Sequence, residues 1–160
     1  MKLHILAIGR LKGEAESSLV EDYLKRLRGL SRQAGMTRID TREFPESRAL
    51  TAAERMRAEA SLLTEALPRD AVTIVLDERG KSISSEDFAR LLARLRDEGT
   101  SDVAFLIGGP DGHGEELRKK AALLLSFGSM TWPHRLVRVM LAEQIYRAVT
   151  ILVNHPYHRP

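Results

Sequence analysis

The sequence has no cysteine, no long apolar run and neither of the two common glycine-rich phosphate motifs. Without cysteine the chain can form no disulfide, no thiolate zinc site and no cysteine nucleophile, which fits a reducing cytoplasm. No stretch approaches the roughly 18 apolar residues of a membrane-spanning helix. Neither G-x-G-x-x-G nor G-x-x-x-x-G-K-[ST] can be found, so a P-loop and a dinucleotide fingerprint are both disfavoured. We therefore expect a cytoplasmic globular protein that acts without a membrane.

Charge is unevenly distributed along the chain. Residues 1–127 hold 21 basic and 21 acidic residues, whereas residues 128–160 hold four arginines and only one acid, Glu143. The whole formal excess of +3, with three of the five histidines, therefore lies near the C-terminus. A cationic, titratable end attached to a neutral body suits an anionic substrate such as nucleic acid.

Apolar residues alternate between strand-like and helix-like spacing. Short apolar runs predict strands, and apolar residues three and four apart predict helices between them. Strands separated by helices favour an α/β fold, a mostly parallel sheet with helices on both faces, and 160 residues suit one domain over residues 1–160. Strands are predicted at Leu3–Ile8, Thr37–Phe44 (an edge strand), Ala71–Asp77 and Val103–Ile107, with a short strand or strand-like loop at Ser126–Thr131. Helices are predicted at Glu14–Leu30, from Thr51 to before Pro68, from Ser84 to Gly99, at Glu115–Leu125 and from Pro133 onward.

Three segments are candidates for a ligand site: two that follow buried strands, and one that lies between two predicted helices. Gly108–Gly112 follows a buried strand, and ligands of open α/β sheets bind beyond the carboxyl ends of strands. Asp77–Lys81 leaves another such strand, and Phe127–Trp132 has a mix of residues that suits a flat ring. The alternatives are a tight strand-to-helix turn, a charged surface turn and a buried strand, respectively.

The last helix is apolar around most of its circumference, and such a helix must be buried on nearly all sides. A subunit interface would bury it, so we expect a homodimer; the alternative is a central core helix.

The chain then ends in His155, Tyr157, His158 and Arg159. A histidine can act as a base near neutral pH, and an arginine can bind phosphate or an oxyanion. The alternative is an arm that only packs, and no third ligand accompanies the histidines, so no metal site is expected.

Taken together, these residues resemble the knotted α/β (SPOUT) methyltransferases, specifically the ribosomal large-subunit methyltransferase H family. Small departures are Asp111, where glutamate is common, and Pro160, one residue beyond the usual end. The resemblance runs along the full chain. It is carried by Met1–Lys12, Leu76–Glu86, Ile107–Gly112, Leu125–Ala148 and Asn154–Arg159.

The resemblance implies transfer of a methyl group from S-adenosylmethionine to N3 of a pseudouridine in 23S ribosomal RNA. It also implies a homodimer, a substrate on the large subunit or whole ribosome, and a C-terminal trefoil knot that sequence physics would not propose. The implied cofactor residues are Leu76, Gly108, Phe127, Gly128, Ser129, Met130, Thr131 and Trp132.

For the chemistry we expect His158 to be the base, with His155 as the alternate and water as a third possibility. Arg159 would hold phosphate or an oxyanion, and Arg138, Arg147 and Tyr157 would contact RNA. In a dimer the tail that completes one pocket can come from the partner. Competing hypotheses are a non-catalytic ribosome- or RNA-binding module, a phosphate-ester hydrolase that uses Asp77 and Asp111, and a purely structural dimer.

Overall fold

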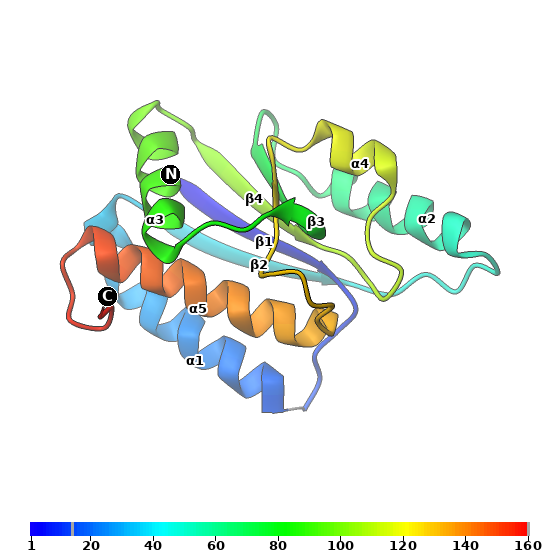
Figure 1. The fold of residues 1–160 in the computed structure, drawn as a ribbon, viewed down its shortest axis with the longest axis horizontal. Helices are drawn as coiled ribbons and strands as arrows, with labels where there is room; N and C mark the ends of the chain where they lie inside the picture. Colours follow the sequence, from blue (N-terminus) through cyan, green and yellow to red (C-terminus); the bar gives the residue numbers. More distant parts are fainter. Residues whose placement is uncertain (14, 160) are drawn as a thin grey trace.

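The computed structural model describes residues 1–13 and 15–159, and its strands form one five-stranded sheet (Figure 1). The strands are β1 (Lys2–Ile8), β2 (Arg38–Phe44), β3 (Val72–Lys81), β4 (Asp102–Ile107) and β5 (Leu123–Leu125). The helices are α1 (Ala15–Leu30), the short 3-10 helix η1 (Ser31–Ala34), α2 (Ala52–Glu65), α3 (Ser85–Asp97), α4 (Glu115–Lys120) and α5 (His134–Leu152). Glu14, the first residue of the first predicted helix, and Pro160 lie outside the described residues.

The sheet is parallel throughout, in the order β2-β1-β4-β3-β5, which confirms the predicted α/β class. β2 lies at one edge, as Pro45 and its alternating pattern predicted. β1 and β4 occupy the interior of the sheet, and both are almost entirely buried. Because all strands run the same way, the loops after them gather at a single edge, the carboxyl edge.

Helices cover both faces of the sheet, and the direction of each crossover determines which face its helix covers. Leu3 and Ile5 of β1 belong to one core with residues of α1, α3 and α5, whereas Leu6 and Ile8 pack with residues of α2 and α4. The connections that lead toward the β2 edge, through α1 and α3, cross the face that packs Leu3 and Ile5. The connections that lead toward the β5 edge, through α2 and α4, cross the other face. This is the pattern that a single crossover hand produces.

The helix starts agree with their sequence signals. Thr51 caps α2, accepting a hydrogen bond from the Glu54 amide, while the Glu54 carboxylate accepts one from the Thr51 amide. Ser84 caps α3 in the same way through the Asp87 amide. These caps satisfy amides that a helix leaves without partners, so they fix where both helices begin.

One predicted element near the C-terminus was wrong. The helix expected at Glu115–Leu125 ends at Lys120, and Leu123–Leu125 forms β5 beside β3. A short apolar run fits a helix and a buried strand equally well, and pairing with β3 decides for the strand. Of the two alternatives predicted for Ser126–Thr131, a short strand or a strand-like loop, the structure shows the loop.

β3 continues past the predicted strand end at Asp77 and carries an irregularity there. Both Leu76 and Lys81 pair with Leu125, so the residues between them bulge out of the ladder. Gly80 lies against the β5 backbone, where an added Cβ would sit 2.6 Å from the carbonyl carbon of Leu124. Only glycine allows this approach.

α5 is buried largely within its own chain, against α1, α3 and the sheet. This intrachain packing accounts for much of its apolar circumference, so homodimerisation stays a prediction, as does the knot. Among the described residues, no helix is long and apolar enough to span a bilayer, and no three acidic or histidine residues group as metal ligands.

Candidate functional site

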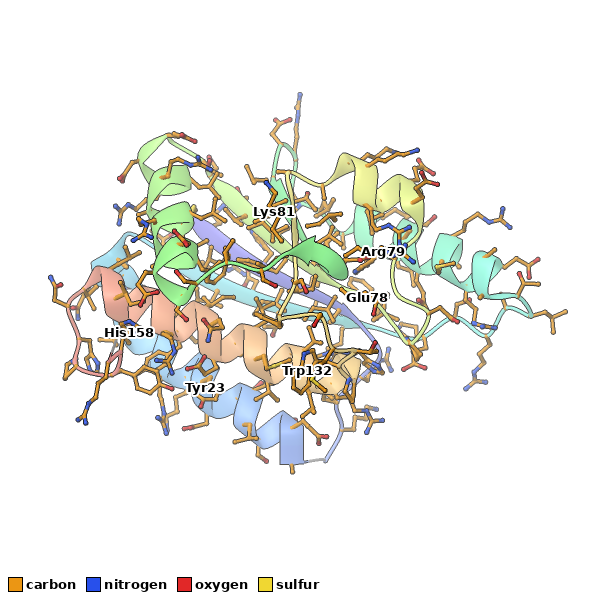
Figure 2. All side chains as sticks on the ribbon, viewed as in Figure 1. Tyr23, Glu78, Arg79, Lys81, Trp132 and His158 are labelled. Atoms are coloured by element: carbon orange, nitrogen blue, oxygen red, sulfur yellow. The ribbon has the colours of Figure 1, made fainter. Side chains whose placement is uncertain are left out.

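A cleft of about 390 Å³ opens at the carboxyl edge, between the segments that follow β3, β4 and β5. Figure 2 shows Glu78 and Arg79 near this end of the molecule, with Trp132 on the neighbouring loop. The beginning of α5 closes one side through His134 and Val137. Residues far apart in the sequence thus surround one space, at the place where parallel α/β sheets bind ligands.

The structure brings seven of the eight predicted cofactor residues to this cleft. Leu76, Gly108 and Phe127 lie at its walls, together with Gly128, Met130, Thr131 and Trp132. Ser129 is not among the lining residues. The assignment of these residues to a cofactor stays a prediction, but their convergence from three loops is a property of the fold.

The glycine segment after β4 forms a compact turn that presents backbone to the cleft. Gly109 and Gly112 form an isolated bridge, and Gly112 has a φ of 73°, which favours glycine. A Cβ at Gly108 would lie 3.0 Å from the Gly112 carbonyl group. The turn has no room for larger side chains beneath a ligand.

The loop after β5 is held on both sides. Ser126 Oγ donates a hydrogen bond to the Gly128 carbonyl at 2.7 Å and accepts one from the Gly128 amide. The backbone φ of Gly128 is 117°. Thr131 Oγ1 donates to Glu78 Oε2 at 3.2 Å and so links this loop to the end of β3. Met130 is 70% exposed and Trp132 is 41% exposed, leaving an apolar lip at the opening.

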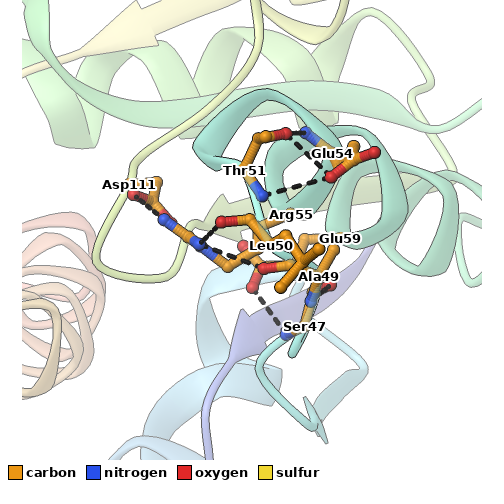
Figure 3. Close-up of polar contacts among 8 residues, drawn as sticks. All are labelled: Ser47, Ala49, Leu50, Thr51, Glu54, Arg55, Glu59 and Asp111. Atoms are coloured by element: carbon orange, nitrogen blue, oxygen red, sulfur yellow. Dashed lines mark hydrogen bonds and ion pairs between the residues drawn. The ribbon is translucent and has the colours of Figure 1, made fainter.

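α2 supports the glycine turn from outside the cleft (Figure 3). Arg55 Nε and Nη2 donate to the two carboxylate oxygens of Asp111 at 2.7 and 3.1 Å, while Nη1 donates to the Ala49 carbonyl. Glu59 accepts from the Ser47 amide through Oε1. Its Oε2 lies behind Gly109 with no partner among the described residues. Burial raises the pKa of the Glu59 carboxyl above its ordinary value.

The C-terminal tail lies against the far part of α5, away from the cleft. Glu143 Oε1 accepts hydrogen bonds from Arg147 at 2.6 Å and from the Tyr157 hydroxyl at 3.0 Å. The Arg147 guanidinium also stacks over the Tyr157 ring. His158 Nε2 lies 2.8 Å from Glu86, and its Nδ1 lies 3.4 Å from Arg147. Both ring nitrogens of His158 are therefore occupied within the chain.

The described tail residues do not line the cleft of their own chain and are held toward the other end of α5. Val137 borders the cleft and Arg147 holds the tail, and the ten residues of helix between them span about 15 Å. Figure 2 likewise shows His158 and Trp132 near opposite ends of α5. His155 and Arg159 are exposed beyond it, with Tyr157's amide donating to His155 Nδ1.

A model described as "Predicted SPOUT methyltransferase" matches residues 1–158. The chain belongs to the SPOUT methyltransferase family. Its relatives include "Ribosomal RNA large subunit methyltransferase H" of Bartonella tribocorum, 53% identical over 99% of both chains. The protein of the same name from Bradyrhizobium sp. is 50% identical over 99% of this chain and 98% of its own length. Among solved structures, a probable methylase family protein from Haemophilus influenzae covers 99% of this chain and 70% of its own, with 11% identity and a TM-score of 0.49.

In this SPOUT methyltransferase Arg138 has a structural position, not the RNA-facing one expected from the sequence. Its side chain is 5% exposed, and its guanidinium donates to the carbonyls of Ile8 and Gly9 and to Glu43. Burial lowers its pKa. Arg138 thus connects α5 to the end of β1 and has no surface to offer a phosphate. Arg147 is likewise held by Glu143, although part of it remains exposed.

Sequence reasoning missed two histidines that line the cleft, His113 and His134. His113 is 4% exposed, burial lowers its pKa, and its Nε2 has no partner within the described residues. Burial also lowers the pKa of His134, which lies 3.6 Å from Glu46. The available signal was position, since each histidine immediately follows a segment already chosen as a ligand loop.

Proposed function

We propose that this SPOUT methyltransferase methylates N3 of a pseudouridine in 23S ribosomal RNA, using S-adenosylmethionine, on assembled ribosomes in the cytoplasm. The observation that carries the proposal is 53% identity, over essentially the whole chain, to a protein named ribosomal RNA large subunit methyltransferase H. The cleft supports it, because its backbone-rich walls suit a nucleoside and its size falls in the range of small-molecule sites.

The cleft residues fit the proposed cofactor. Gly108 and the Phe127–Trp132 loop offer close backbone approach and apolar surface for an adenosine. Asp77 and Glu78 lie on the same wall and can face a positive charge. S-adenosylmethionine supplies an activated methyl group on a cationic sulfur, so a cleft with carboxylates and no need for metal ligands suits it.

The acceptor side of the reaction needs alignment and removal of one proton from the base. Alignment alone can lower a barrier by roughly 7–11 kcal/mol in favourable cases. Arg147, which contacts His158, lies about 15 Å along α5 from Val137 at the cleft, and both ring nitrogens of His158 are engaged. We therefore propose that the tail, with His158, His155 and Arg159, completes the cleft of a partner subunit.

A homodimer would also cover exposed apolar surface at the cleft end of the molecule. Leu19 of α1 and Leu136 of α5 are 48% and 38% exposed, and these helices pack side by side. Met130 and Trp132 extend this surface to the cleft lip. Burial of such a patch favours association.

Calorimetric titration with S-adenosylmethionine tests the cofactor site. The wild-type chain should bind, and a folded Gly108→Trp variant should not, because its indole would collide with the Gly112 backbone and fill the cleft. Binding by neither protein at millimolar cofactor would contradict the cleft assignment. It would then favour a non-catalytic ribosome-binding module.

Mixed dimers test whether the tail acts across subunits. In a dimer of one Gly108→Trp chain and one His158→Ala chain, the first chain has an intact tail and the second an intact cleft. These two parts form one complete site only if the tail of each chain reaches the cleft of its partner. Activity in this mixed dimer, with none in either parent dimer, supports the proposal; inactivity contradicts it.

Single-turnover methylation by His158→Ala at several pH values tests the base, and an unchanged rate and pH profile would remove His158 from that role.

A further inference from the structure

Basic side chains at the carboxyl edge lack the acidic partners that surround most arginines in this chain. Arg10 and Lys12 follow β1, Arg48 follows β2, and Arg79 lies on the irregular end of β3. All four are exposed. Within residues 1–13 and 15–159, none of the four forms an ion pair. We call these four residues the basic rim.

The acids on the same loops are already engaged. Asp111 binds Arg55 through two hydrogen bonds, Asp77 lies 3.6 Å from Arg118, and Glu78 accepts from Thr131. Their charges are thus directed inward, toward the scaffold of the cleft. Glu46, near His134, and Glu78 remain exposed acids of this edge, so the four cations of the rim exceed them and leave its outward-facing charge positive, although the sequence counts of residues 1–127 balance.

Three members of the rim are linked to the cleft through the chain. Arg79 lines it directly. Arg10 follows Gly9, where a Cβ would lie 3.2 Å from the ring of His134, a cleft residue. Arg48 stands between Ser47 and Ala49, which are held by Glu59 and Arg55 of α2. The rim therefore has a defined position relative to the place where the methyl acceptor would enter.

We propose that the basic rim binds the phosphates of the RNA strand whose base enters the cleft. This inference rests on the proposed function and identifies where its RNA substrate docks. Cations spaced over three loops around an opening can hold consecutive backbone phosphates and leave the base to the cleft. The rim carries no base-reading group, so it supplies affinity and orientation, and its contribution falls with salt as counterion release requires.

The test variant is Arg10→Gln/Lys12→Gln/Arg48→Gln, whose three positions lie outside the cleft. The matched control is Arg28→Gln/Arg32→Gln/Arg69→Gln, which removes the same charge from exposed positions at the opposite edge of the sheet. Methylation of purified ribosomes is measured at several salt concentrations, and S-adenosylmethionine affinity is measured without ribosomes.

The rim variant should raise KM for ribosomes by on the order of tenfold or more, with kcat and cofactor affinity close to wild type. The slope of log kcat/KM against log salt should become shallower by about two to three, near 0.7–0.9 for each phosphate that the variant no longer binds. The control should change neither quantity. An unchanged KM would overturn the proposal. A raised KM with an unchanged salt slope would also overturn it, because that is the result expected if the rim contacts ribosomal protein instead of RNA. Absence of methylation by the wild-type protein would instead overturn the proposed function.

Discussion

The first turns of α5 border the open cleft, and its later turns hold the C-terminal tail, so one helix serves two regions with opposite use of their polar groups. In the tail, Glu143, Arg147 and Tyr157 bind one another, and His158 lies between Arg147 and Glu86. In the cleft, by contrast, the Nε2 atom of the buried His113 has no partner among the described residues. A self-satisfied cluster is suited to hold a position, and an unsatisfied one to receive a ligand.

The largest expected effect comes from the support of the cleft, at Gly80. A Gly80→Ala variant places a methyl group 2.6 Å from the β5 backbone, so β3 and β5 must separate. We expect urea unfolding to show a decrease in stability of about 1–3 kcal/mol, the usual cost of overpacking. Gly29→Ala, in α1 with no neighbour within 4 Å of the new atom, is the control and should gain up to about 1 kcal/mol. Equal stability of the wild type and Gly80→Ala would contradict the close approach.

The next effect is a pH dependence that originates at the cleft. Because burial lowers the pKa of His113, the unfolded chain binds this proton at higher pH than the folded one. Stability should therefore be complete above about pH 6.5 and decrease as pH falls, by at most about 1.4 kcal/mol per pH unit from this group. His113→Asn should make the decline measured by thermal or urea unfolding shallower. Exposed His155→Asn, in the tail, should leave it unchanged; equal slopes for all three proteins would argue against a neutral buried His113.

A smaller effect is expected from the link between α2 and the glycine turn. Arg55→Ala removes two hydrogen bonds to Asp111 and two to backbone carbonyls of residues 49 and 50. The turn should become less ordered, and S-adenosylmethionine affinity measured by calorimetry should fall several-fold, equivalent to about 1 kcal/mol. Arg57→Ala, exposed on the same helix, is the control. Full cofactor affinity in an Arg55→Lys variant would count against a role for the paired hydrogen bonds to Asp111, since lysine cannot form such a bidentate pair.

The smallest effect is expected in the tail. Glu143→Gln removes the charge that holds Arg147 and Tyr157, so amides of residues 154–159 should exchange faster in hydrogen exchange by mass spectrometry. Global stability should change by less than about 1 kcal/mol, because terminal segments open independently of the core. Cofactor affinity should not change. A decrease in cofactor affinity equal to that of Arg55→Ala would show that the two regions are not separate.

The sequence predicted the strands of the sheet well, because β1 and β4 contain runs of apolar residues and Thr51 and Ser84 mark helix starts. It predicted the loops after β3 and β4 for the same reason, since each follows a recognisable strand, whereas Phe127–Trp132 was chosen for its mix of small, aromatic and polar residues. Leu123–Leu125 could not be assigned, because three leucines have no period. Their partner, β3, is more than 40 residues earlier in the chain.

Side-chain roles were harder to predict than positions. The C-terminal excess of arginine suggested an RNA-binding end, yet Arg138 is buried against Ile8 and Gly9. The basic rim lies instead in the part of the chain where charges balance by count. Which acids are engaged inside the protein depends on tertiary contacts such as Arg55 with Asp111, and local sequence contains no information about them.

Because β5 is short and, among the described residues, pairs only with β3, we expect the cleft to form late in folding. Every pairing in this sheet is parallel and joins distant segments, a topology that folds slowly. Phe127–Trp132 takes its place only after β5 has docked on the bulged end of β3. A small molecule that binds there would recognise the finished protein and not its precursors. Its binding energy would add to stability by mass action, so cellular cofactor supply would set how much of the chain stays folded.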